Sequence, residues 1–329
     1  MEAISLSFRV REWNRQGDWD SFARLSWGTA KATNSAYHQG LVKTNPGKTG
    51  EELFRIYEEE LKEFDFDNER CRVFVIEVER RFAGYVWLSI RDSRDSWELT
   101  RPMWIYDITL HSDYRGRGLG RILMKRAEEW AIEQKRNLGL FVHAHNEPAI
   151  RLYEGEGYVV KSTPMTLRFS EMDSASRLSE RLEFLEDDYR NKRRGKQVAH
   201  DRFARLVRFS EEANDEEIAT AYQSFVDSYT SDELEHSRFV ASREGKTTGV
   251  LSVGQAPFRK DIGMIYEHAL VNGDETVQQA FLAKAVSWAQ DRGLSALYIL
   301  LHAMDDFRPS VLESAGFVVP GYFMEKRLI

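Results

Sequence analysis

Hydrophobic residues in the first half of the chain follow two different spacings. Stretches rich in β-branched and aromatic residues predict strands, and the stretch centred on "VERR" predicts a hairpin. Apolar residues at 119, 122, 123, 127 and 130 recur at the spacing of one helix face. Strands are expected over 7–13, 71–92, 103–110, 138–145, 158–162 and 164–170, with helices over 18–30, 51–64, 119–134 and 148–157. This order of elements predicts a mixed α/β fold.

The same pattern returns in the second half of the chain. The stretch "RFVASREGKTTGVLSV" matches "VFVIEVERRFAGYVWL", and "MIYEHALV" matches "WIYDITLH". Further on, "AKAVSWAQ" matches "MKRAEEWAI", and "HAMDDFRPSVLESAGFVV" matches "HAHNEPAIRLYEGEGYVV". Four matching segments in the same order predict two copies of one domain. We place them at residues 1–170 and 202–329.

Residues 171–201 differ in composition from both copies, because almost all of them are charged or polar. Leu178, Leu182 and Leu185 fall on one stripe, which predicts a connecting helix with one packed face. The basic run "RNKRRGK" fits either a solvated helix end or a nucleic-acid contact. The net charge of −7 argues against a dedicated nucleic-acid binder, so no nucleic-acid partner is expected.

The composition argues against several other classes of protein. The one cysteine, Cys71, excludes an internal disulfide and a cysteine-rich zinc site, and its apolar neighbours indicate a core residue. No apolar stretch is long enough to span a bilayer, and the first residues lack the pattern of a signal peptide. We therefore expect a cytoplasmic protein with neither a membrane partner nor a metal.

The stretch "DYRGRGLGR", at residues 113–121, lies between a predicted strand and a predicted helix. A dinucleotide-binding turn would need a third glycine where Arg121 stands, and the Lys-Ser/Thr of a P-loop is missing. What remains is Arg115-x-x-Gly118-x-Gly120. Successive N–H groups at such a turn can bind phosphate oxygens, and glycine lets a pyrophosphate approach the backbone. A tight turn without a ligand is the alternative.

This motif resembles the acetyl-CoA signature of the GNAT acetyltransferase superfamily. The downstream stretch "NEPAIRLYEGEGYVV" is similar to the second motif of that family, and the order of elements agrees over about residues 8–170. The resemblance implies two tandem domains, each with a mostly antiparallel central sheet flanked by helices. It also implies that the central strand splays from the next parallel strand, and that acetyl-CoA enters the gap. The residues implied in acetyl-CoA binding are Leu110, His111, Ser112, Arg115, Gly116, Arg117, Gly118, Leu119, Gly120, Arg121 and Asn146.

Transfer of an acetyl group to an amine needs a base, oxyanion donors and an acid for the leaving thiolate. Tyr153 matches the family tyrosine that serves as the acid. Asp107 is the candidate base, although strand alternation puts it opposite Tyr106 unless a bulge re-aims it. His143 and His145 are rival proton carriers. The side chains of Trp87, Trp104 and Tyr106 fit either core packing or a cation-binding pocket.

The second copy lacks these features. Asp274 and Glu275 stand where the first copy has its arginines, and Leu312 stands at the position of Tyr153. Carboxylates would repel a pyrophosphate, so we expect this copy to have lost acetyl-CoA binding. It would complete the substrate pocket, stabilise the first domain or bind a partner.

These observations predict an N-acetyltransferase that moves an acetyl group from acetyl-CoA to a primary amine, either a small molecule or a peptide, by direct attack. The alternative is a non-catalytic acyl-CoA sensor that uses the second copy as an interaction surface. The sequence leaves a homodimer open.

Overall fold

The computed structural model describes residues 7–90, 102–171, 182–186, 195–210, 213–230, 233–271 and 274–329. The first half contains β1 (Phe8–Glu12), α1 (Arg15–Ala32), α2 (Ala36–Thr44), α3 (Gly50–Lys62), β2 (Cys71–Val78), β3 (Arg81–Ile90), β4 (Met103–Leu110), η1 (Ser112–Tyr114), α4 (Leu119–Glu133), β5 (Leu138–His143), α5 (Glu147–Gly155), β6 (Val159–Arg168) and η2 (Phe169–Glu171). The second half contains β7 (Glu183–Glu186), α6 (Lys196–Ser210), α7 (Asp215–Tyr229), β8 (His236–Arg243), β9 (Lys246–Ala256), β10 (Arg259–Leu270), α8 (Glu275–Asp291), β11 (Ala296–His302), α9 (Pro309–Ser314) and β12 (Gly321–Lys326).

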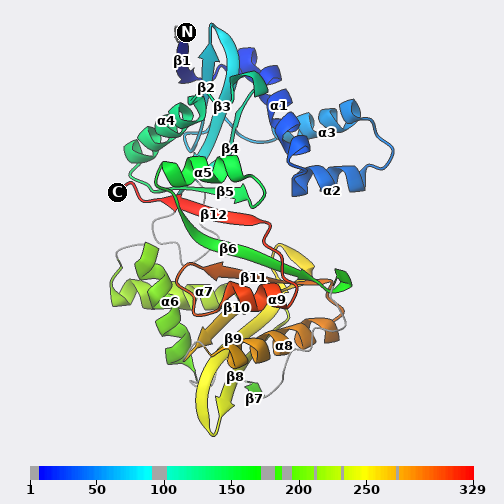
Figure 1. Ribbon diagram of the computed structural model, residues 1–329, viewed down its shortest axis with the longest axis vertical. Helices are drawn as coiled ribbons and strands as arrows, with labels where there is room; N and C mark the ends of the chain where they lie inside the picture. The colour runs from blue at the N-terminus through cyan, green and yellow to red at the C-terminus, as the bar shows by residue number, and fades with distance from the viewer. Residues whose placement is uncertain are drawn as a thin grey trace.

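The twelve strands of the described ranges form one continuous mixed sheet, in the order β1-β2-β3-β4-β5-β12-β6-β11-β10-β9-β8-β7 (Figure 1). The mixed α/β prediction is therefore confirmed. In each half, helices cover both faces of the sheet. The cores on the two faces contain α4 and α1–α3 in the first half, and α8–α9 and α6–α7 in the second.

The two halves exchange their last strands. Strand β12, from the end of the chain, lies between β5 and β6 of the first half, and β6 pairs over residues 162–168 with β11 of the second (Figure 1). Each exchanged strand also delivers side chains to the other core. Met324 of β12 belongs to the first-half core, whereas Met165 and Leu167 of β6 belong to the second-half core. A boundary drawn at residue 170 therefore cuts the chain but does not separate two closed sheets.

Two details of the sequence interpretation were wrong. Residues 159–168 form one long strand, because β11 pairs with residues 162–168 and β12 pairs with Val159, Val160 and Ser162. Within the predicted connecting helix, Glu183–Glu186 instead form β7, which pairs with the edge strand β8, because an open sheet edge offers hydrogen bonds that a solvated helix would not gain. Leu182 and Phe184 pack on the second-half core, and Leu178 lies outside the described residues. The domain boundaries themselves stay a prediction.

Two glycines at matching positions, Gly84 and Gly249, are required for the same steric reason in both halves. A Cβ on Gly84 would collide with the carbonyl oxygen of Thr109, and a Cβ on Gly249 would collide with that of Ala269. In each half, the third sheet strand therefore approaches its neighbour too closely for any side chain at this point.

Strands β4 and β5 are parallel but pair only over Met103–Ile105, so they separate toward their carboxyl ends. The strand β4 also carries a bulge: Trp87 of β3 faces Asp107 and Leu88 faces Ile105, which leaves Tyr106 as the extra residue. The second half repeats both features, with a register shift at Tyr266. The splay and the bulge together open the sheet at its middle.

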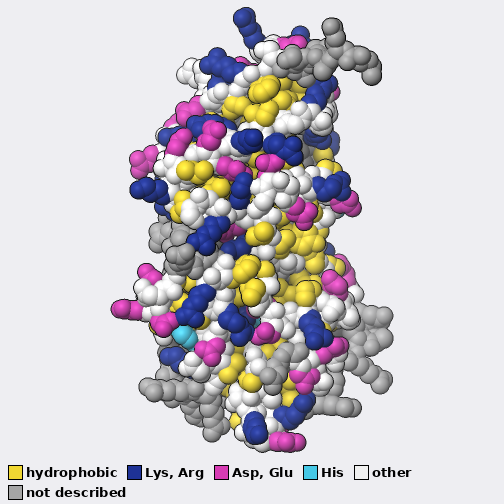
Figure 2. All heavy atoms as spheres, turned by 60° about the vertical axis from the view of Figure 1, so that its left-hand side comes forward, with side chains coloured by type: hydrophobic (Ala, Val, Ile, Leu, Met, Phe, Trp, Pro, Cys, Tyr) yellow, Lys and Arg dark blue, Asp and Glu magenta, His cyan; other side chains and the backbone are white. Residues whose placement is uncertain are grey.

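None of the helices in the described part of the chain is long and apolar enough to cross a membrane. On the face shown in Figure 2, Lys and Arg side chains are interspersed with Asp and Glu.

We predict that Met324→Ala lowers the free energy of unfolding by about 2–5 kcal/mol, because it removes a fully buried side chain from the core of the other half. Hydrogen exchange should accelerate in β5, which is far away in sequence. Met304→Ala is the matched control, since Met304 is 45% exposed. Equal effects of the two changes would contradict the exchange of strands.

Candidate active site

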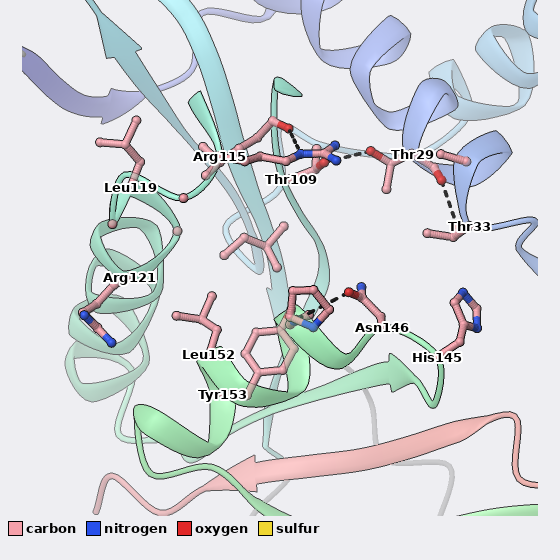
Figure 3. A pocket seen from close by; sticks show the side chains of 18 residues that line it. Thr29, Thr33, Thr109, Arg115, Leu119, Arg121, His145, Asn146, Leu152 and Tyr153 are labelled. Carbon is pink, nitrogen blue, oxygen red and sulfur yellow. Dashed lines mark hydrogen bonds between the residues drawn. The ribbon is translucent and has the colours of Figure 1, made fainter. Parts of the chain in front are cut away.

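A cavity of about 680 Å³ lies between the glycine loop, the end of β4 and α5. Figure 3 shows side chains from α1, α4 and α5 converging around it. Its walls include Thr29 of α1, Thr33 at the C-cap of that helix, Leu152 and Tyr153 of α5, and backbone of the loop. The cavity occupies the place where β4 and β5 have separated, so the splayed strands create it.

The loop leaves the N-terminus of α4 open. Gly116 and Gly118 have φ angles of +73° and +80°, in the left-handed region that favours glycine. Gly118 is the N-cap residue and offers no side-chain cap. Hence the first N–H groups of α4 have no side-chain acceptor at the cap and lie at the cavity wall. This arrangement suits an anion.

Most of the predicted cofactor residues line this cavity. These are Leu110, Arg115, Gly116, Gly118, Leu119, Gly120, Arg121 and Asn146. His111, Ser112 and Arg117 are exposed and lie outside its lining.

Three of the lining side chains already have partners within the chain. Arg115 donates from Nε to the carbonyl oxygen of Leu110 at 3.0 Å. Arg121 forms an ion pair with Glu156. The side-chain oxygen of Asn146 accepts from the Ala149 N–H at 3.4 Å and so caps α5, which gives Asn146 a structural role as well.

A second cavity, of about 330 Å³, adjoins the first. The two share lining residues, among them Thr29, Ile108 and Tyr153. The second cavity is lined by Trp87, Trp104, Tyr106 and Asp107, so the bulge does bring Tyr106 and Asp107 to one cavity. Tyr153 therefore stands at the junction of a loop-lined cavity and an aromatic one.

Asp107 is held by hydroxyl groups. Its Oδ2 accepts from Ser26 Oγ at 3.0 Å and from the Tyr85 hydroxyl, and the Tyr57 hydroxyl donates to Ser26 Oγ at 2.7 Å. No lysine or arginine of the described residues forms an ion pair with Asp107. Burial raises the pKa of Asp107 above its usual range, although these hydrogen bonds act against that shift. A carboxylate in this setting is a stronger base than one in water.

Tyr153 is only 6% exposed. Burial, aided by the negative charge of Asp107, raises the pKa of Tyr153 well above its ordinary value. The phenol therefore stays protonated at neutral pH, so its hydroxyl group can donate a hydrogen bond to a nearby anion.

The two histidines are divided between the cavities. His143 lines the smaller cavity and His145 the larger, and their rings stack at 5.4 Å. Burial and the nearby His145 lower the pKa of His143. Both remain candidate proton carriers.

Sequence reasoning missed the contribution of α1. Ser26, Thr29 and Thr33 all line the cavities, and Thr29 Oγ1 hydrogen-bonds with Thr109 Oγ1 at 2.8 Å. Their spacing places them on one helix face, and this polar stripe on an otherwise core-facing helix was the available signal.

In the second half, buried side chains with partners stand at the matching positions. Gln278, which occupies the position of Gly120, is fully buried and bonds through Nε2 to the Asp306 carbonyl at 3.1 Å. Arg202 of α6 pairs with Asp305 at 2.6 Å, and Asp305 lies 3.1 Å from His268. The side chain of Asp274 caps α8 through the Thr276 N–H, so the N-terminus that is open in α4 is closed here. Gly273, which precedes this turn, lies outside the described residues.

No group of three or more His, Cys, Asp or Glu side chains within the described ranges is arranged to hold a metal ion.

Comparison with known proteins gives one family. Residues 38–158 match the Acetyltransferase (GNAT) family. The chain is similar to an uncharacterized N-acetyltransferase of Bacillus subtilis, with 32% identity over 25% of this chain and 50% of that protein. It is also similar to an uncharacterized N-acetyltransferase of Methanocaldococcus jannaschii, with 33% identity over 27% of this chain and 39% of that one. The chain thus spans half or less of the length of these curated relatives.

A solved GCN5-related N-acetyltransferase from Sphaerobacter thermophilus has a similar fold over nearly the whole chain. The TM-score is 0.52 at 17% identity, and the alignment covers 98% of this chain and 96% of that one.

Buried charges in the second half predict a pH-dependent stability. Burial, with the positive charge of Arg202 nearby, lowers the pKa of His302 to about 4. Between pH 6.5 and 4 the unfolded chain therefore takes up a proton that the folded chain does not, so stability falls as the pH falls. From pH 7 to 5, urea unfolding should show a loss of about 2 kcal/mol from this group. His302→Asn should reduce that loss, whereas the change His111→Asn, at an exposed histidine, should not. Identical pH slopes would refute the prediction.

Proposed function

We propose that this chain, whose residues 38–158 match the Acetyltransferase (GNAT) family, is an acetyltransferase whose first half transfers an acetyl group from acetyl-CoA to a primary amine. The observation that carries the proposal is the position of Tyr153 at the junction of the two cavities. One cavity offers backbone N–H groups and cationic side chains, and the other offers a carboxylate among aromatic rings.

The larger cavity is the proposed site of acetyl-CoA. Its open α4 N-terminus and the two left-handed glycines suit a pyrophosphate. The part of β4 beyond Ile105 lacks β5 as a neighbour, so its backbone can pair with the pantetheine arm. Arg115 and Arg121 place positive charge beside the loop. The smaller cavity then receives the amine.

The proposed reaction steps follow from the protonation states of the amine, Asp107 and Tyr153. An amine attacks only as the neutral base, and Asp107 is placed to accept the proton that the amine must lose. The nitrogen bonds to the thioester carbon, and N–H groups of β4 in the gap stabilise the oxyanion. When the carbon–sulfur bond breaks, the electron pair stays on sulfur, Tyr153 gives its proton to the thiolate, and the nitrogen releases its second proton to solvent to leave the neutral amide. Solvent then reprotonates Tyr153. No covalent enzyme intermediate is required.

We further propose that the second half has lost acetyl-CoA binding and supports the first. Gln278 and the Arg202–Asp305 pair occupy the space that the first half keeps open, and Leu312 provides no proton donor. Meanwhile, β12 completes the sheet beside β5.

We expect Tyr153→Phe to lower kcat roughly 10²-fold to 10⁴-fold with little change in acetyl-CoA affinity, because only the proton is removed. Asp107→Asn should lower kcat/KM over a similar range. Thiol release with a panel of amines measures the rates, and calorimetry measures the affinity. Tyr322→Phe, on β12 and outside both cavity linings, is the control. Acetyl-CoA binding without turnover of any amine in the unmodified protein would favour the sensor function instead.

Gly120→Gln should abolish acetyl-CoA binding, because it installs in the first half the side chain that fills the second. Even the new Cβ would lie 3.3 Å from Leu152. Gly40→Gln on α2, where a Cβ meets nothing within 4 Å, should bind normally. Calorimetry with acetyl-CoA tests both variants, and normal binding by Gly120→Gln would exclude the loop as the site.

A further inference from the structure

The smaller cavity has aromatic walls. Trp87 and Tyr106 stack with their centroids 5.2 Å apart and their planes 23° apart, and Trp104 and Phe141 add further lining. Tyr106 is 47% exposed, although it lies at the centre of the sheet. A large apolar surface left open inside a cavity is typical of a site that an apolar ligand covers.

Residues outside the cavity pack against these aromatic walls and fix their positions. Phe323 of the exchanged strand β12 packs against Trp104 at 5.9 Å and against Phe141 at 5.1 Å. Gly139 makes room for the Trp104 ring, since a Cβ there would lie 2.6 Å from it. On the other side, Phe64 meets Trp87 edge-on at 4.8 Å. These contacts fix the positions of the rings, so the smaller cavity is a preorganised aromatic slot. A flat ligand would therefore lose little free energy in ordering the rings.

Negative charge predominates among the side chains that line the slot. Asp107 is the carboxylate that lines it, and none of its described lining residues is a lysine or arginine. His143, the remaining basic group, is partly buried beside His145 and offers no permanent positive charge. A ligand that brings its own carboxylate would find no cation to pair with and would meet Asp107. An unpaired charge of this kind reduces the binding free energy in a site that is partly shielded from water.

The volume of the smaller cavity also limits which ligands can bind. A cavity of about 330 Å³ is at the small end for ligand sites, so it fits a small molecule better than a long peptide.

We propose that the acceptor is a small arylalkylamine: a primary amine on an aromatic body, without a carboxylate. This inference rests on the proposed function, because it names the amine of that reaction. The ammonium end would lie at Asp107, near Tyr153, and the ring would lie against Trp87 and Tyr106.

Matched pairs of ligands test the proposal on the full chain in the presence of coenzyme A. Calorimetry compares phenethylamine with phenylalanine, and tryptamine with tryptophan; each pair differs by one carboxylate. Spermidine serves as an amine without a ring. We expect each arylalkylamine to bind at least about tenfold more tightly than its amino acid and than spermidine, in line with the loss from an unpaired charge.

A substitution in the slot sharpens the test. Tyr106→Arg supplies the missing cation and should shift the preference toward the amino acids. Phe258→Arg, at a residue that is 58% exposed and outside the slot, should leave it unchanged. Equal or tighter binding of the amino acids or of spermidine by the unmodified protein overturns the inference, as does the absence of binding by every arylalkylamine.

Mass spectrometry after incubation with acetyl-CoA separates this inference from the proposed function. If the arylalkylamines bind with the expected preference but are not acetylated, the ligand class stands and the transferase function fails. If other amines are acetylated while arylalkylamines do not bind, the function stands and the ligand class is wrong.

Discussion

The exchange of β6 and β12 is the constraint on which the rest of the structure depends. Each strand is hydrogen-bonded on both edges, and each carries buried side chains into the core of the opposite half. The ladder of main-chain bonds therefore runs without a break from β1 to β7. Neither half has a complete sheet of its own, so each half depends structurally on a strand from the other.

The cavities come from the parting of two parallel strands. Since β4 and β5 pair over only three residues, the carboxyl end of β4 is left without a neighbour on one side. The bulge at Tyr106 then turns Asp107 toward the same space. Both halves contain the splay and the bulge, which means that the fold alone does not make a site. The difference lies in what fills the opening.

The contrast between the two carboxylates illustrates this point. Asp107 is held by hydroxyl groups alone among the described residues, which leaves its charge uncompensated and its pKa raised. Its counterpart Glu267 accepts from Tyr222 and Tyr229, each at 2.9 Å, but also lies 3.5 Å from the buried guanidinium of Arg238. Among the described residues, the same bulge thus presents a carboxylate held by hydroxyl groups in one half and a buried ion pair in the other.

The sequence by itself predicted two copies of one domain, most elements of the first copy, the glycine loop and the absence of that motif from the second copy, because each of these is recorded in local patterns of residue type and spacing. It also identified Tyr153 and Asp107 as chemically suitable. Only the tertiary structure decided that the two halves exchange strands, that residues 183–186 join a sheet edge, and that Ser26 and Tyr85 hold Asp107. It alone decided that Arg202 pairs with Asp305 and that Gln278 bonds to the backbone of Asp306. These outcomes depend on contacts between residues far apart in the chain, and the local spacing of hydrophobic positions carries no information on which distant partner each strand or side chain meets.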